Sequence, residues 1–272
     1  MNIAHRFHTR SRAGFALAEL AVSMAIFLAI CGAMFLLLNS SQKHYDTQTK
    51  LLGSFQDARL GVDEIVRDAE NSGYPPQNQF ALGVNALAAS AYTNSPVAWS
   101  PNYPTTACLI GTAGGGTCTT PGDFDAIFEE ATDTTGIVKW IRYQLVGTTL
   151  FRGVVTKVAG DPSGPTTAAG VLLPYVTNVV NNVSAAQRAQ YVADYPNMFP
   201  GGVAQPVFQY YCDGAANTAP VLCQNAGAYN SPVNVRDIEI NLIVLASQND
   251  QQTQKPRLVQ LQGRGHRVNP NQ

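Results

Sequence analysis

Residues 15–38 read FALAELAVSMAIFLAICGAMFLLL, and this run decides the fold because its 24 residues contain a single charged side chain, Glu19. At about 1.5 Å per residue, a helix of this length measures roughly 36 Å. That length exceeds the hydrocarbon core of a bilayer, which is about 30 Å thick. The run therefore predicts one membrane-spanning helix.

The charges around this run predict its orientation. Arg6, Arg10 and Arg12 precede it, and no acidic residue stands before Glu19. By the positive-inside rule, the N-terminal side stays in the cytoplasm and the chain after Leu38 crosses the membrane. The prediction is a single-pass protein with its remaining domain outside the cytoplasm.

A cleaved secretory signal and a lipoprotein signal both match the apolar run less well. A secretory signal peptide has a shorter apolar core that ends in a small-x-small cleavage site, whereas residues 39–44 read NSSQKH. A lipoprotein signal requires a small residue before the modified cysteine, but Ile30 precedes Cys31. A signal anchor that carries an incidental acid near its polar edge remains an open alternative.

Glu19 is the unusual residue of the run. A carboxylate in a membrane helix costs about 2.5–3.5 kcal/mol at the bilayer centre, so such a group usually has a partner. Residues 12–27, RAGFALAELAVSMAIF, resemble the prepilin processing and methylation motif of type IV pilins and pseudopilins. In that family a glycine precedes a large apolar residue, and a glutamate is the fifth residue of the mature chain. Gly14, Phe15 and Glu19 match these positions one by one.

The resemblance implies how the chain is processed. Residues 1–14 would be a cytoplasmic leader peptide, which a prepilin peptidase removes by cutting between Gly14 and Phe15 and then N-methylating Phe15. Glu19 would pair with the Phe15 amine of the same or a neighbouring subunit during filament assembly. The expected partners are other pilins or pseudopilins, the prepilin peptidase, the inner-membrane assembly platform and the membrane. The expected location is the inner membrane before assembly and a periplasmic or extracellular filament afterwards.

An amphipathic continuation of the helix is predicted over residues 39–73. Apolar residues recur on one face at steps of three and four: Leu51, Phe55, Ala58, Val62, Ile65 and Ala69. Polar residues fill the other face: Lys50, Gln56, Arg59, Asp63 and Arg67. We expect the apolar face to pack against a sheet. We expect the helix to end at Ser72, because Gly73 can adopt the left-handed C-cap conformation and prolines follow.

The remaining sequence predicts an irregular region and then a sheet. Residues 74–121 are rich in Asn, Ala, Ser, Thr, Pro and Gly and show no sustained period. Residues 122–272 contain apolar and β-branched runs between turn residues, and in residues 237–244, DIEINLIV, apolar residues take alternate positions. The predicted fold class is α+β: a long N-terminal spine helix packed on a mainly antiparallel β-sheet head, as in pilins.

Four further stretches resemble PilW-type minor pilins. They are GSFQDARLGVDEIVRDAENSGY (53–74), VFQYYCDG (207–214), VRDIEINLIVLAS (235–247) and RLVQLQG (257–263). Arg67, Asp68, Gly73 and Tyr74 match the helix end of that family, while the insert before Pro121 has no counterpart there. The resemblance implies a minor pilin that joins a type IV pilus or primes its assembly. The related minor pseudopilins of type II secretion systems are the alternative, and a solitary membrane-anchored binding or adhesion domain is a third possibility.

The cysteines predict disulfides on the translocated side. Cys31 lies in the apolar run and is interpreted as an apolar filler. Cys108, Cys118, Cys212 and Cys223 lie where oxidation is permitted, and their spacing suggests the pairs 108–118 and 212–223, although three pairings are possible. A zinc site is the alternative, but neither pair has the close spacing of a zinc knuckle.

Other chemistry is weakly represented, so we predict neither an enzyme nor a cofactor or metal site. The sequence has no nucleophile elbow, phosphate loop or HExxH motif. The acidic residues Asp123, Asp125, Glu129 and Glu130 carry oxygen atoms that calcium prefers, but a strand would divide them between two faces. With charged residues at 13% and a net charge of -1, nucleic-acid binding is not indicated.

Overall fold

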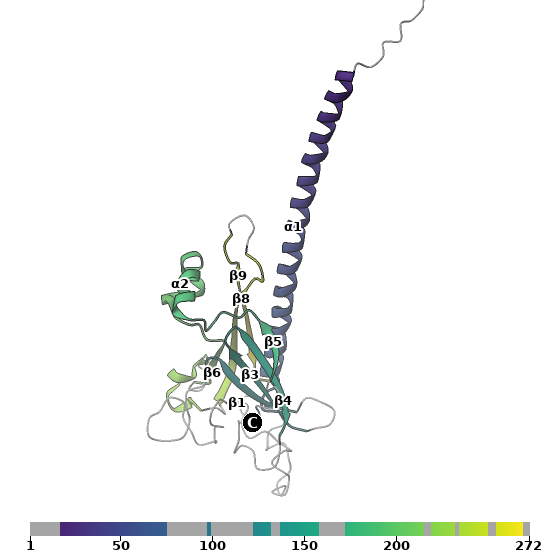
Figure 1. Ribbon diagram of the computed structural model, residues 1–272. Coiled ribbons are helices and arrows are strands. Elements are labelled where there is room, and N and C mark those ends of the chain that lie inside the picture. Colours follow the sequence, from purple (N-terminus) through teal and green to yellow (C-terminus); the bar gives the residue numbers. More distant parts are fainter. Residues whose placement is uncertain are drawn as a thin grey trace, which may run out of the picture. The chain divides into compact units, whose positions relative to one another are not determined.

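The computed structural model describes residues 17–74, 97–98, 122–131, 137–157, 172–214, 219–231, 234–249 and 254–268. The chain divides into two compact units, Met1–Thr49 and Lys50–Gln272. We call the second unit the head. Helix α1 (Leu17–Asn71) passes from the first unit into the head, and the described strands all belong to the head (Figure 1).

The strands form two antiparallel sheets. The first has the order β1–β2–β3–β4–β5 and contains β1 (Val97–Ala98), β2 (Asp125–Glu130), β3 (Lys139–Val146), β4 (Thr149–Thr156) and β5 (Leu173–Thr177). The second has the order β7–β6–β8–β9 and contains β6 (Phe208–Cys212), β7 (Val221–Leu222), β8 (Val235–Leu245) and β9 (Leu258–His266). The coarse prediction is therefore confirmed: the fold is α+β, with a long N-terminal helix and antiparallel sheets.

Local sequence accounts for several of these strands. The hairpin of β3 and β4 turns at Gly147, whose φ of +61° favours glycine. The predicted strand around residues 237–244 is β8, in which Ile238, Ile240, Leu242 and Val244 are all buried. Pro174 lies in β5, an edge strand, where its missing N–H removes no bond from the centre of the sheet.

The two sheets are joined by the chain that leaves β5. Val179 forms an isolated bridge with Val244 of β8. The buried side chain of Asn181 continues this pairing: its Oδ1 accepts the Ile243 N–H at 2.8 Å, and its Nδ2 donates to the Asn241 carbonyl at 2.8 Å. An amide side chain thus replaces backbone ladder bonds at the point where the sheets meet.

The main core lies between the end of α1 and both sheets. Its members on α1 are Ala58, Val62, Ile65 and Ala69, all buried as predicted, while Phe55 is partly buried. From the sheets come Phe128, Tyr143, Leu150, Phe208, Ile238 and Leu242. Helical periodicity therefore identified the packed face of α1 correctly.

Some elements of the head were not predicted. Helix α2 (Ala185–Asp194) begins with a capping box, in which the Ser184 hydroxyl accepts the Gln187 N–H. It packs on a smaller core of Val180, Val183, Phe199, Ile243 and Leu258. Two short 3-10 turns follow α2, namely η4 (Pro196–Met198) and η5 (Pro200–Gly202). Two more follow β7, namely η6 (Cys223–Asn225) and η7 (Gly227–Tyr229).

The region predicted to be irregular contains one short strand. The sequence predicts that residues 74–121 are irregular, but Val97 and Ala98 form β1 and pair with Phe128 and Ile127 of β2. Two residues are too few to show an alternating pattern, so the sequence carried no signal for this strand. The other described residue of that range is Tyr74.

Candidate functional site

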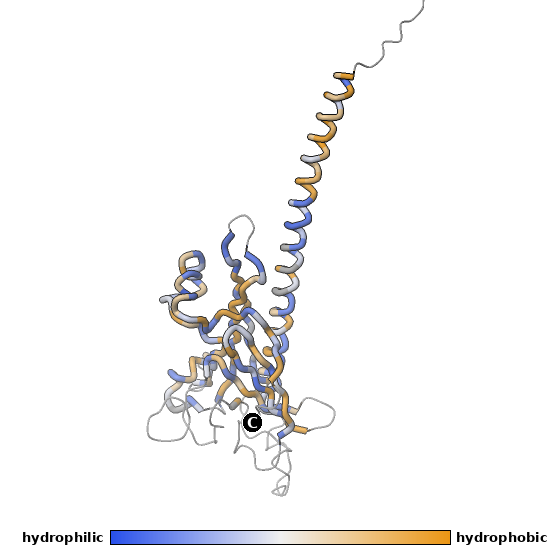
Figure 2. Tube along the Cα trace, viewed as in Figure 1, coloured by the Kyte–Doolittle hydropathy of each residue, from blue (hydrophilic) through white to orange (hydrophobic). Residues whose placement is uncertain are grey.

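The first part of α1 presents an apolar surface. From Leu17 to Leu38 the side chains are exposed, including Phe27 (65%), Phe35 (73%) and Leu37 (71%). Among the described residues, α1 is the helix that is long and apolar enough to span a membrane. Figure 2 shows the apolar residues concentrated in this part of the helix. An exposed apolar helix of this length needs a bilayer or another protein to cover it.

Glu19 lies in the first turn of this helix and is exposed. The next charged residue along α1 is Lys43, so Glu19 is the single charge of the apolar part. Its place near the helix N-terminus is favourable for a carboxylate, because the helix dipole is positive there. The predicted processing residues, Gly14 and Phe15, lie outside the described residues.

Small residues occupy one face of the same segment. Ala18, Ala21, Ala25, Ala29 and Gly32 follow one another at steps of three and four, which places them on one side of the helix. A Cβ atom added at Gly32 would meet no atom within 4 Å. Such faces allow helices in a membrane to approach closely.

The second part of α1 packs very closely on the sheets. A Cβ atom added at Gly263 would lie 2.6 Å from Cγ2 of Val66, and one added at Gly265 would lie 2.8 Å from Cβ of Ala69. Likewise, a Cβ atom at Gly61 would lie 2.6 Å from Cγ2 of Val176. Glycine is therefore required on both sides of the helix–sheet contact.

A buried polar cluster also joins α1 to the first sheet. The Tyr143 hydroxyl donates to Oδ2 of Asp68 at 2.5 Å, and Nη2 of Arg152 donates to the same oxygen at 3.0 Å. Nε of Arg152 donates to the Tyr143 hydroxyl at 2.8 Å, and Glu64 lies 3.5 Å from Nη2 of Arg152. Burial, reinforced by the Asp68 charge, raises the pKa of Tyr143, so its hydroxyl remains a donor.

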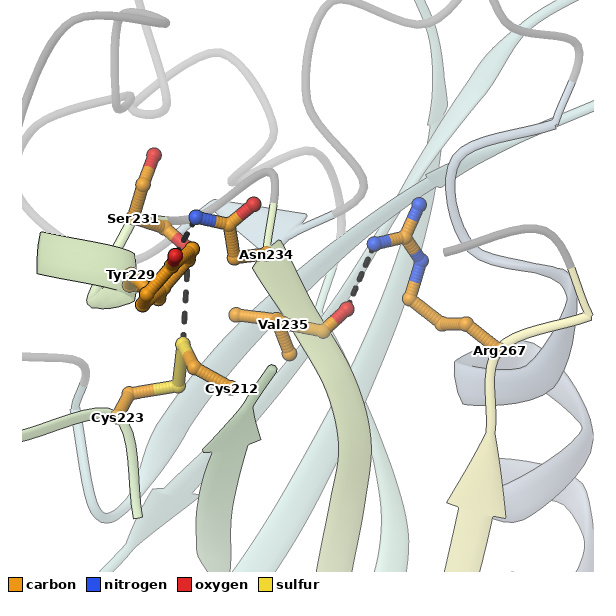
Figure 3. The surroundings of a disulfide bond; sticks show 7 residues. All are labelled: Cys212, Cys223, Tyr229, Ser231, Asn234, Val235 and Arg267. Atoms are coloured by element: carbon orange, nitrogen blue, oxygen red, sulfur yellow. Dashed lines mark hydrogen bonds between the residues drawn. A yellow bond between two sulfur atoms is a disulfide. The ribbon is translucent and has the colours of Figure 1, made fainter. Parts of the chain in front are cut away.

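The C-terminal end of α1 is fixed by its own set of bonds. Gly73 has a φ of +89°, as expected for the left-handed C-cap, and its N–H donates to the Glu129 carbonyl at 2.8 Å. Nε of the buried Arg267 donates to the Ser72 carbonyl at 3.2 Å, and its Nη1 donates to the Val235 carbonyl at 2.6 Å (Figure 3). Burial lowers the pKa of Arg267 to about 10, which leaves it charged at neutral pH.

The predicted disulfide between Cys212 and Cys223 is present, on β6 and at the start of η6 (Figure 3). Sγ of Cys212 also lies 3.6 Å from the Ser231 carbonyl oxygen. Because both sulfurs are bonded to each other, this pair does not supply zinc ligands. Cys108 and Cys118 lie outside the described residues, so that pairing stays a prediction. Cys31 is a free thiol on the exposed surface of α1.

The acidic residues on and before β2 do not converge on a calcium site. Asp125 binds Nε and Nη2 of Arg142 at 3.0 and 2.5 Å, while Glu129 forms a fully buried ion pair with Lys157. Glu130 is buried on a neighbouring position of β2. Within the described ranges, no group of three or more His, Cys, Asp or Glu side chains is placed to hold a metal ion.

Comparison with known proteins found no relative of this chain. No family model matches the chain, and neither a curated protein nor a solved structure shows significant similarity to it. The site is therefore defined by its own residues. It consists of the exposed apolar part of α1, which carries one carboxylate in its first turn. Within the head, glycines, a polar cluster and Arg267 hold the second part of α1 against the sheets.

Proposed function

We propose that this chain is a minor pilin-like subunit, cleaved after Gly14 and assembled into a type IV pilus through its N-terminal helix. The observation that carries the proposal is the apolar first part of α1, exposed along its length and bearing Glu19 in its first turn. An ammonium group at Phe15, four residues before Glu19, is a suitable counter-charge for a carboxylate held in an apolar environment.

The architecture supports a mechanical role for the helix. In an assembled filament, side chains that face lipid before assembly would pack against sister helices, and the small face from Ala18 to Gly32 allows close approach. Force on that helix would reach the head through its second part. The Asp68–Tyr143 bond, the ion pair of Asp68 with Arg152 and the bonds of Arg267 resist separation of helix and sheet.

Processing is the step that tests this proposal. The protein is recovered from its native membrane, with and without an active prepilin peptidase, and its intact mass and N-terminal sequence are measured. We expect a chain that begins at methylated Phe15 and depends on the peptidase. An uncut N-terminus, or cleavage beyond Leu38, would contradict the proposal and favour a membrane-anchored binding domain instead.

The alternative filament is that of a type II secretion system, in which the chain would be a minor pseudopilin. Both filaments use the same helix and the same processing step, so the N-terminus does not separate them. Deleting the gene for the chain separates them. Loss of surface pili with normal protein secretion would support a role in the pilus. Retained pili with loss of protein secretion would support a role as a pseudopilin.

A further inference from the structure

The apolar part of α1 is followed by a short polar stretch that carries one aromatic side chain. Residues 39–46 read NSSQKHYD, and all of them are helical and exposed. Tyr45 is the aromatic residue among them, and it is 70% exposed. Within the part of the chain that the structure describes, no hydrogen bond or ring contact engages its side chain. Packing within the protein therefore does not account for a tyrosine at this position.

The length of the helix places this stretch beside a membrane that covers the apolar run. Residues 20–38 carry no charge and measure about 28 Å as a helix, which matches a hydrocarbon core of about 30 Å. The outer edge of that core therefore lies near Leu38. Lys43 and Tyr45 follow at about 8 and 10 Å further along the helix. The headgroup layer beyond the core is about 5–8 Å thick, because a whole bilayer measures about 40–45 Å.

The direction of helical side chains brings both residues closer to this layer. Side chains on an α-helix lean toward its N-terminus, which is the membrane side of the stretch. The Lys43 ammonium and the Tyr45 hydroxyl therefore reach back toward the headgroups. Because residues two positions apart are separated by about 200° around a helix, the two side chains lie on nearly opposite sides of α1. Asp46, the acidic residue of the stretch, lies further from the membrane than Lys43.

We propose that Lys43 and Tyr45 bind phospholipid headgroups on the side of the membrane opposite the N-terminus, and thereby set the depth of α1. The Lys43 ammonium donates to lipid phosphate, and the Tyr45 ring lies among the ester groups with its hydroxyl toward water. Both side chains suit this layer, because each combines an apolar body with a polar end. The proposal rests on α1 crossing the membrane, as in the proposed function, but it does not depend on assembly into a filament.

Fluorescence quenching at known depths tests the position of Tyr45. The full chain is reconstituted into vesicles of phosphatidylethanolamine and phosphatidylglycerol, with a nitroxide on the headgroup or bromine near the ends of the acyl chains as quencher. The headgroup nitroxide should quench the indole of Tyr45→Trp at least about threefold more strongly than that of Thr49→Trp, which lies one turn further out. The parent protein, which has two tryptophans, supplies the background emission. Phe27→Trp is the insertion control, and deep bromine should quench it most.

A second set of variants tests whether the two residues set the depth. Phe35→Trp places an indole near the outer end of the apolar run, and the ratio of its quenching by shallow and by deep bromine reports its depth. Adding Lys43→Gln and Tyr45→Ala should change this ratio at least about twofold, because the helix can then slide or tilt. Adding Gln42→Ala and Gln48→Ala instead is the matched control, since these exposed side chains carry neither charge nor ring. It should leave the ratio unchanged.

The controls separate failure of this proposal from failure of the anchor. If deep bromine does not quench Phe27→Trp, α1 does not cross the bilayer, and both this proposal and the proposed function fail. If Phe27→Trp is quenched but Tyr45→Trp is quenched no more than Thr49→Trp, the headgroup site is wrong and the anchor stands. An unchanged depth ratio after the loss of Lys43 and Tyr45 would also overturn the proposal.

Discussion

The Tyr143 hydroxyl donates a 2.5 Å hydrogen bond to Asp68, so a strand and the spine helix are joined across 75 residues of sequence. Both side chains are buried, and Arg152 contacts each of them. Removing the hydroxyl would leave Asp68 and Arg152 with one partner fewer in a place that water does not easily reach. The cluster is therefore a sensitive point of the contact between α1 and the first sheet.

Tyr143→Phe should lower the free energy of unfolding of the head by about 1–3 kcal/mol, the usual effect of leaving a buried polar group unsatisfied. Denaturant titration of the full chain in micelles measures this change. Tyr175→Phe is the matched control, because its ring lies 5.8 Å from that of Tyr143 but is only partly buried. A loss as large in Tyr175→Phe as in Tyr143→Phe would contradict a specific role for the Asp68 bond.

Gly265→Ala should destabilise the head by about 1–3 kcal/mol, because the new methyl group would overpack the contact between β9 and α1. The obstacle is rigid: the added Cβ would lie 2.9 Å from the backbone carbonyl of Val66. Gly53→Ala is the opposite case, since no atom lies within 4 Å of its added Cβ and the site is helical. It should raise stability by about 0.5–1 kcal/mol. Thermal melting compares the two, and a neutral Gly265→Ala would show that the contact adapts.

Asp123→Asn should make the head more stable at pH 7. Burial raises the pKa of Asp123 above its ordinary 3.8, so the folded state binds this proton more tightly than the unfolded state does. Above the raised pKa the charge costs stability, and the asparagine variant avoids that cost. The difference between the two proteins should shrink as pH falls through the raised pKa and vanish below 3.8. Denaturant titrations at pH 7 and pH 3 check it, and a parent protein that is more stable than the variant at pH 7 would refute the argument.

Glu19→Ala should leave membrane insertion intact but reduce the amount of the chain in sheared filaments by about tenfold, as expected when a buried ion pair is lost. Asp46→Ala is the matched control, because this carboxylate lies on the same helix beyond the apolar run. Quantitative immunoblots of membrane and filament fractions measure both variants. Normal incorporation of the Glu19→Ala protein would remove the proposed role of Glu19.

Local patterns predicted the parts of the fold that depend on neighbours in sequence. The packed face of α1, including Ala58 and Ile65, follows from helical periodicity, and the end at Gly73 follows from glycine's access to positive φ. The strand β8 was visible because apolar residues alternate along it. Helix α2 was missed, although the capping box of Ser184 and Gln187 was a usable signal.

The sequence by itself determined the apolar run of residues 15–38, and it carried the predicted orientation of that run and its resemblance to a processing motif, because these depend on composition and spacing within about 30 residues. Only the tertiary structure decided that Asp68 meets Tyr143 and Arg152, and that Gly263 and Gly265 of β9 lie against α1. These contacts join segments that are far apart in the chain. The packing of the two sheets and one helix decides which residues meet, and no local sequence pattern encodes that packing.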